Sequence, residues 1–179
     1  MNYAHFLTYL PDTFNGSNYT QPCYSRFKEH LIAERFTVYP SEFECPGSDH
    51  PYVDIAARMG GMFWAFEYKS ANDSISRGVE QLKCYSQWFD YVVLVTEREL
   101  DHRKSQNYWG LKDIGAGLWS YDPGSEKRTE RTNPAKQNPI RSNRKLVASR
   151  FRNLRRSREL IEFEVFIGNQ RRLPEFSSV

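Results

Sequence analysis

The sequence has few cysteines, no long apolar run and no recognisable leader. Its 179 residues include only three cysteines, an odd number with no CxxC pair, which argues against a disulfide framework and favours a reducing, cytoplasmic compartment. Cys23, Cys45 and His50 are conceivable zinc ligands, but their spacing matches no zinc pattern. No apolar run approaches the ~18 residues of a spanning helix. The opening MNYAHFLTYL lacks a basic start and a cleavage site, so we expect neither a signal peptide nor a membrane partner.

The apolar content is nevertheless sufficient for a folded core. Hydrophobic residues make up 39% of the chain and aromatic residues 15%, which argues against wholesale disorder. The length corresponds to about one domain with an appendage. We expect an N-terminal arm over residues 1–23, a core over 24–122, and a basic linker and C-terminal extension over 123–179.

Positive charge is concentrated near the C-terminus. The net charge is only +3, but the stretch 127–158 has twelve basic residues and one acid, so it carries +11 and the rest of the chain −8. Such a block suggests a polyanion, most commonly nucleic acid, and its excess of arginine over lysine suits phosphate oxygens. A solvated tail without a specific partner is the alternative. The candidate phosphate contacts are Arg141, Arg144, Lys145, Arg150, Arg152, Arg155 and Arg156.

Periodicity and turn residues predict a mixed α/β sheet with helices packed on it. A Gly-Gly pair between two strand-like runs indicates a hairpin, because a two-residue turn of the primed type needs positive φ. The run YVVLVT is typical of a strand covered on both faces. The predicted elements are a helix over Tyr24–Phe36, a bent extended segment over Thr37–Glu44, strands over Tyr52–Met59 and Met62–Ser70, a helix over Ser74–Asp90, strands over Tyr91–Thr96 and Leu118–Tyr121, a linker or mobile loop over 123–139, a basic helix over Arg144–Glu159 and a strand over Ile161–Ile167.

The hairpin brings two carboxylates and an ammonium together. If Gly60-Gly61 is the turn, residues whose numbers sum to about 121 face each other, so Asp54 opposes Glu67. Lys69 lies on the same face as Glu67, because side chains alternate along a strand. The neighbouring residues are mostly apolar, so this patch is not an ordinary wet surface.

Two facing carboxylates repel each other unless a cation compensates them. Mg²⁺ or Mn²⁺ suits such oxygen ligands, and Asp54 and Glu67 are the candidate metal ligands. A bound ion would neutralise charge on a phosphodiester under attack, and Lys69 could stabilise the developing negative charge. The alternative is a plain salt bridge between Lys69 and one carboxylate.

Asp54 followed twelve residues later by Glu67-Tyr68-Lys69 resembles the PD-(D/E)XK nuclease superfamily, in its Holliday-junction-resolvase and RecB-like branches. The resemblance covers about residues 24–122, although the usual proline directly before the aspartate is displaced to Pro51. It implies a restriction-endonuclease-like αβββαβ core and metal-dependent DNA cleavage.

The helix after the hairpin carries Gln81 and Tyr85 in a QxxxY pattern. In the RecB-like branch such residues lie beside the metal site and touch DNA. The resemblance therefore implies a catalytic role for Gln81 and DNA contact for Tyr85, with Arg77 one turn earlier as a further DNA contact. The alternative is that Tyr85 is a core residue and Gln81 a surface residue.

The superfamily often has an extra acid on its first helix. We favour Glu29 as this catalytic acid, with Glu34, Glu42 and Glu44 as competitors. The histidines of the chain are better explained as surface or packing residues than as general bases.

The leading hypothesis is thus a divalent-metal-dependent DNA endonuclease. A non-catalytic DNA-binding protein that uses the arginine-rich segment 127–158 is the alternative, and an RNA-directed module is a third, although no RRM or KH signature supports it. A homodimer follows only by analogy with enzymes that dimerise to cut two strands.

Overall fold

The computed structural model describes residues 21–97, 106–122, 128–133, 135–138 and 142–156. The elements are α1 (Gln21–Ala33), β1 (Thr37–Val38), β2 (Phe43–Glu44), β3 (Tyr52–Val53), β4 (Ile55–Met59), β5 (Met62–Lys69), α2 (Ile75–Tyr85), β6 (Tyr91–Thr96), α3 (Gln106–Asp113), β7 (Gly117–Tyr121) and β8 (Arg128–Asn133). Residues 144–156 are also helical. Residues 1–20 of the predicted arm over 1–23, and the predicted strand over Ile161–Ile167, lie outside the described residues. The last three residues of the predicted arm, 21–23, belong to α1, so the arm ends earlier than expected.

The six-stranded sheet has the order β1-β4-β5-β6-β7-β8. Its centre is parallel, since β5 pairs with β6 and β6 with β7 in parallel, while the pairs toward both edges are antiparallel. The chain order through β6 is helix, three sheet strands, helix, strand. This is the αβββαβ order, so the prediction of a mixed α/β, restriction-endonuclease-like fold is confirmed.

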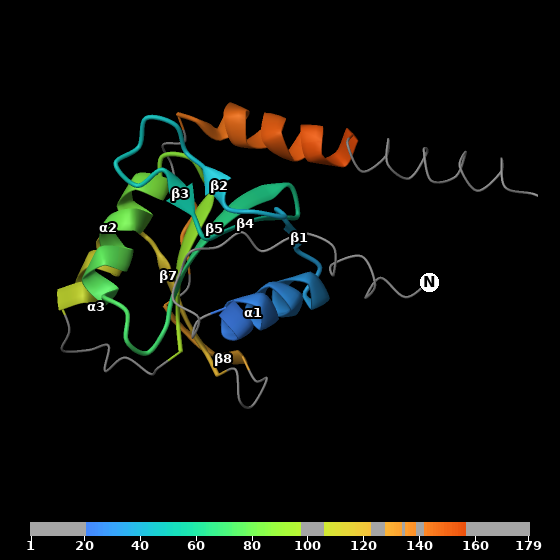
Figure 1. The fold of residues 1–179 in the computed structure, drawn as a ribbon. Helices are drawn as coiled ribbons and strands as arrows, with labels where there is room; N and C mark the ends of the chain where they lie inside the picture. Colours follow the sequence, from blue (N-terminus) through green and yellow to red (C-terminus); the bar gives the residue numbers. More distant parts are fainter. Residues whose placement is uncertain (1–20, 98–105, 123–127, 134, 139–141, 157–179) are drawn as a thin grey trace, which may run out of the picture.

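Helices cover both faces of the sheet (Figure 1). On one face α1 contributes Phe27 and Leu31 to a cluster with Phe66 and Val93 of the sheet. On the other face lie α2, α3 and the helix over 144–156, around a larger cluster that includes Leu94. Because alternate residues of β6 enter the two clusters, the predicted strand covered on both faces is confirmed.

The helix predictions are right in place but shifted at their ends. The first helix ends at Ala33, and its predicted apolar residue Ile32 is 43% exposed. The second begins after Ser74, whose hydroxyl accepts a hydrogen bond from the Arg77 amide, and ends at Tyr85 rather than Asp90. The predicted basic helix is present over residues 144–156, and its remaining residues 157–159 lie outside the described part.

One predicted strand is two strands. The run Tyr52–Met59 is divided at Asp54: Tyr52 and Val53 pair with β2 in a separate two-stranded sheet, and Ile55–Met59 pairs with β5. The cause is the Asp54 side chain, whose Oδ2 accepts the backbone N–H of Tyr68 at 2.8 Å. The Tyr68 N–H of β5 therefore bonds to a side chain instead of a strand backbone, just beyond the last β4–β5 pair, Ile55 and Phe66.

The predicted linker contains a strand, and one helix was not expected. Residues 128–133 form β8 against β7, so the interpretation of 123–139 as a linker or mobile loop is wrong there. The sequence RTERTN has no apolar residue to signal a strand, and the segment joins the sheet by backbone pairing with β7. In α3, an aromatic pair and Gly110 obscure any helical period.

Candidate active site

The Gly60-Gly61 turn fixes the register of the site. Both glycines have positive φ, 58° and 82°, which favours glycine at each position. Met59 pairs with Met62 and Ile55 with Phe66, as the two-residue turn predicts. The strand pairing ends at Ile55. Asp54 directly precedes Ile55, and its carboxylate accepts the backbone N–H of Tyr68, the residue after Glu67.

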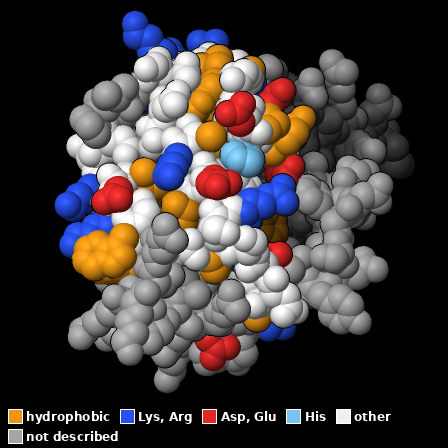
Figure 2. Space-filling view, turned by 90° about the vertical axis from the view of Figure 1, so that its left-hand side faces the viewer, with side chains coloured by type: hydrophobic (Ala, Val, Ile, Leu, Met, Phe, Trp, Pro, Cys, Tyr) orange, Lys and Arg blue, Asp and Glu red, His pale blue; other side chains and the backbone are white. Residues whose placement is uncertain are grey.

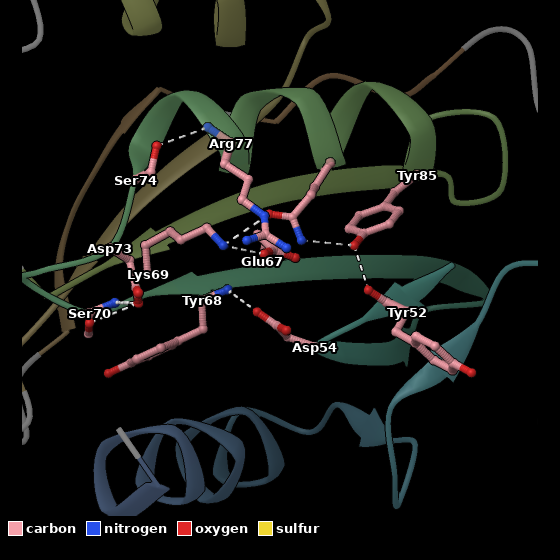
Figure 3. Close-up of polar contacts among 11 residues, drawn as sticks. Tyr52, Asp54, Glu67, Tyr68, Lys69, Ser70, Asp73, Ser74, Arg77 and Tyr85 are labelled. Atoms are coloured by element: carbon pink, nitrogen blue, oxygen red, sulfur yellow. Dashed lines mark hydrogen bonds and ion pairs between the residues drawn. The ribbon is translucent and has the colours of Figure 1, made fainter. Parts of the chain in front are cut away.

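Glu67, Lys69 and Gln81 form a buried polar chain between β5 and α2 (Figure 3). Lys69 Nζ lies 2.5 Å from Glu67 Oε1 and donates to Gln81 Oε1 at 3.0 Å. Gln81 is only 9% exposed. The interpretation of Gln81 as a surface residue is therefore wrong, and the structure places it beside the two β5 residues.

Asp54 approaches this group from the end of β3. Its carboxylate is held by the Tyr68 amide, and its backbone carbonyl accepts a hydrogen bond from the Tyr24 hydroxyl of α1. Burial raises the pKa of Asp54, against the opposing effects of the Tyr68 hydrogen bond and the positive charge of Lys69. Two elements, β5 and α1, thus fix the position of one carboxylate.

The surroundings of Glu67 disfavour its ionised form. Burial first, and then the negative charge of Asp54, raise the pKa of Glu67 to about 8, against the pairing with Lys69 and the nearby Tyr85 hydroxyl. That hydroxyl itself donates to the Tyr52 carbonyl. Its second oxygen, Oε2, is buried and has no hydrogen-bond partner within the described residues. Such an orphaned oxygen is costly, and a hard divalent cation would satisfy it.

The donor set is small. Within the described ranges, no group of three or more histidine, cysteine, aspartate or glutamate side chains is arranged to hold a metal. Asp54 and Glu67 therefore fit an ion that accepts one or two carboxylates and keeps its waters, as Mg²⁺ does, better than an ion that needs a full protein cage. Cys45 is buried and forms no disulfide, and the side chain of Cys23 is not described, so no zinc site is supported.

A glycine in α2 provides the space for Lys69. A Cβ on Gly78 would lie 2.7 Å from Leu94 Cδ1 and 3.1 Å from Lys69 Cε. The Lys69 side chain therefore packs against α2 at the position where Gly78 has no side chain. The signal was present in the sequence, because glycine inside a helix is disfavoured and stands one turn before Gln81.

Tyr85 supports the site from the core. It is fully buried, and its hydroxyl donates to the Tyr52 carbonyl at 2.5 Å and lies 3.5 Å from Gln81 Nε2. Burial raises the pKa of this hydroxyl. Tyr85 has no exposed surface, so it is not placed to contact DNA as expected. The alternative, that Tyr85 is a core residue, fits the structure.

The structure does not bring Glu29 to the site. Glu29 is exposed on α1, since Phe27 and Leu31 occupy the buried face. Glu42, one of its competitors, is half-buried, and burial together with the charge of Asp54 raises its pKa. Glu42, in the segment between β1 and β2, is thus a further acid near Asp54, and Asp73 is another.

The predicted DNA contacts fall into different environments. Arg77 is exposed on α2, and its side chain extends toward the Lys69–Gln81 group (Figure 3). Arg144 and Arg150 are engaged with protein groups, while Arg141 lies outside the described residues. The exposed members on the helix over 144–156 are Lys145, Arg152, Arg155 and Arg156.

Comparisons with known proteins give partial matches. A family model described as Bacteriophage P4 protein cII matches residues 29–105, fewer than half of the chain, and this span contains Asp54, Glu67, Lys69 and Gln81. A search of curated proteins gives no significant match.

Two solved structures match this chain at low identity. An XisH family protein from Nostoc punctiforme is 18% identical with a TM-score of 0.43, and the match covers 62% of this chain and 98% of that one. A fdxN element excision controlling factor protein from Anabaena variabilis is 17% identical with a TM-score of 0.41, and the match covers 61% and 96%. Separately, none of the helices in the described part of the chain combines the length and apolar character needed to cross a bilayer.

Proposed function

We propose that this chain is a divalent-metal-dependent DNA endonuclease that hydrolyses phosphodiester bonds at Asp54, Glu67 and Lys69. One observation carries the proposal. Oε2 of the buried Glu67 has no hydrogen-bond partner among the described residues, and Oε1 lies 2.5 Å from Lys69 Nζ. The nearby negative charge of Asp54 also disfavours ionisation of Glu67. This combination suits a divalent cation, which Asp54 and Glu67 would hold and which would supply positive charge to a phosphate.

Asp54 and Glu67 would hold Mg²⁺ or Mn²⁺, which when bound neutralises phosphate charge and acidifies its own water. The protein supplies positioning. The Tyr68 amide orients the Asp54 carboxylate, and Gln81 accepts one N–H of the Lys69 ammonium while Glu67 takes another. An ammonium has three donors, so a third N–H can reach an oxygen of the attacked phosphate and stabilise its developing charge.

DNA as the substrate is supported by the resemblance of the D…ExK residues and by the basic stretch 127–158. The test is incubation with supercoiled, linear, branched and single-stranded DNA, and with RNA, in Mg²⁺ or in EDTA. We expect at least one DNA form to be cleaved in Mg²⁺ and none in EDTA. Binding that ignores the chelator, without cleavage of any form, would instead identify a non-catalytic DNA-binding protein. Cleavage of RNA alone would identify an RNA-directed enzyme.

A further inference from the structure

The helix over 144–156 has a buried face and an opposite basic face. Val147 is fully buried and Phe151 6% exposed, and Phe151 packs on Phe63 with ring centroids 5.2 Å apart. Four other positions, separated by four, three and four residues, fall on one line because a helix has ~3.6 residues per turn. They are Lys145, Ser149, Arg152 and Arg156, and all three cations are exposed.

Two arginines on the flanks of this helix fix it to the core. Arg144 Nε lies 2.8 Å from Oδ1 of the fully buried Asp90, and its guanidinium also donates to the Gly61 carbonyl at 3.1 Å. Arg150 donates to the Glu44 carbonyl at 2.7 Å and lies 3.7 Å from the Glu44 carboxylate. These guanidinium groups are already bound to the protein.

The start of the helix is also attached to the loop that follows α2. The Asn143 amide donates to the Gln87 carbonyl at 3.2 Å. Asn138 makes further contacts with the same region. Its side-chain amide donates to the Phe89 carbonyl at 3.0 Å, and its backbone N–H donates to the Asp90 carbonyl at 2.9 Å. The helix is therefore held in a defined orientation across the β2, β3 and hairpin end of the molecule (Figure 1). The outward cations are consequently presented on a fixed surface.

We propose that Lys145, Arg152 and Arg156, here called the basic stripe, bind the phosphate backbone of double-stranded DNA. Arg144 and Arg150 hold the stripe in position and do not contact DNA. The inference rests on the proposed function in taking DNA as the partner, but it concerns binding rather than cleavage. The fourth position on this line is a serine, so no acidic side chain interrupts the row of cations.

The composition and spacing of the stripe favour a duplex. From residue 145 to 156 the helix rises roughly 16 Å, and each DNA strand presents a phosphate about every 3.4 Å of axis. The three cations, spread along this length, can therefore reach several phosphates of one duplex. The face carries no aromatic residue, and Phe151 points into the core, so the stacking platform typical of single-strand binding is absent from it.

The surface on the side of α2 and α3 differs from this row of cations. On the side of α2 and α3, lysine and arginine side chains are interspersed with acidic and apolar ones (Figure 2). A mixed surface of this kind attracts a polyanion less than a row of one sign. The basic stripe is therefore the better candidate for contact with the backbone.

The experiment compares two triple variants of the full chain that remove the same net charge. The stripe variant is Lys145→Gln, Arg152→Gln and Arg156→Gln, and the control variant neutralises three exposed cations on other elements, Arg35→Gln, Arg58→Gln and Lys112→Gln. Binding of a fluorescent duplex is measured by anisotropy in EDTA, between 50 and 200 mM salt. EDTA prevents cleavage, so binding is measured by itself.

We expect the stripe variant to bind at least tenfold more weakly, with the slope of log K against log salt reduced by about 0.9 for each phosphate that the variant no longer neutralises. The control should keep most of the affinity and slope. Equal losses in the two variants, or no loss in the stripe variant, would overturn the proposal. This binding assay contains no metal, so its result does not depend on cleavage. If the separate assay in Mg²⁺ showed no cleavage, the proposed function would be refuted and the binding result would stand.

Discussion

At the scale of single residues, Glu67 determines the behaviour of the site. A carboxylate that is 1% exposed and has one oxygen without a partner among the described residues is unfavourable when ionised, even beside Lys69. Such a cost persists in a stable fold when it serves binding. The raised pKa of Glu67 therefore has a measurable consequence for the protein without metal.

We expect the free energy of unfolding, measured in EDTA, to fall as the pH rises from about 4.5 to about 8. In this window the folded protein keeps a proton on Glu67 whose pKa is raised to about 8, whereas the unfolded chain, with a value near 4.5, has released it. The native state binds more protons, so rising pH destabilises it. Urea denaturation across this range should show the slope in the wild type and a flatter profile in Glu67→Gln.

Glu29→Gln is the matched control, because this carboxylate is exposed on α1 and its loss should leave the slope unchanged. Parallel profiles for wild type and Glu67→Gln would contradict the assignment of a raised pKa to Glu67.

The residues of the site were predictable where spacing along one element determines them. The turn register placed Asp54 opposite Glu67, strand alternation placed Lys69 with Glu67, and the QxxxY pattern pointed to Gln81. Contacts between elements were not predictable from spacing. The support of Asp54 from Tyr24, and the space that Gly78 leaves for Lys69, depend on how helices cross the sheet.

At the scale of elements, the sequence was informative where apolar residues recur with a period. The hairpin, α2 and β6 have that signal, whereas β8, which pairs with β7, contains no apolar residue. The arginine-rich helix was predicted, but the sequence did not show which of its cations bind protein groups and which are exposed. Whether an arginine faces DNA or a buried aspartate depends on which partner the fold brings near it.

Arg144 holds this helix through Asp90, so Arg144→Met should destabilise the protein. Removing one partner of a buried ion pair costs roughly 3–5 kcal/mol, and the lower end applies here because the Arg144 side chain is 36% exposed. Asp90 also accepts the Phe63 amide, so Asp90→Asn combined with Arg144→Met should recover part of the stability. Urea denaturation gives the stability, and hydrogen exchange over residues 144–156 reports release of the helix.

Lys145→Met is the matched control for this prediction. Lys145 is the neighbouring cation and is exposed, so its replacement should change stability by less than about 0.5 kcal/mol. Similar stabilities for Arg144→Met and Lys145→Met would show that the Asp90 pair does not hold the helix.

At the scale of the whole molecule, the candidate site and the helix over 144–156 occupy different places on the same face of the sheet. The carboxylates and Lys69 lie where β5 meets α2, and the helix over 144–156 is attached at the hairpin end through Asp90, Gly61 and Glu44. In the proposed function one region performs hydrolysis and the other holds the backbone. Changes in the first should therefore alter rate without altering affinity.

The most direct measurement is the cleavage rate of Asp54→Ala, Glu67→Ala and Lys69→Ala in Mg²⁺, on a DNA substrate that the wild type cuts, with the affinity of each variant measured in EDTA. Each variant should lose cleavage by at least a hundredfold, in line with removal of one charge-stabilising group from an active site, while its affinity stays near that of the wild type. Full activity in purified, folded Lys69→Ala would contradict the role assigned to this site.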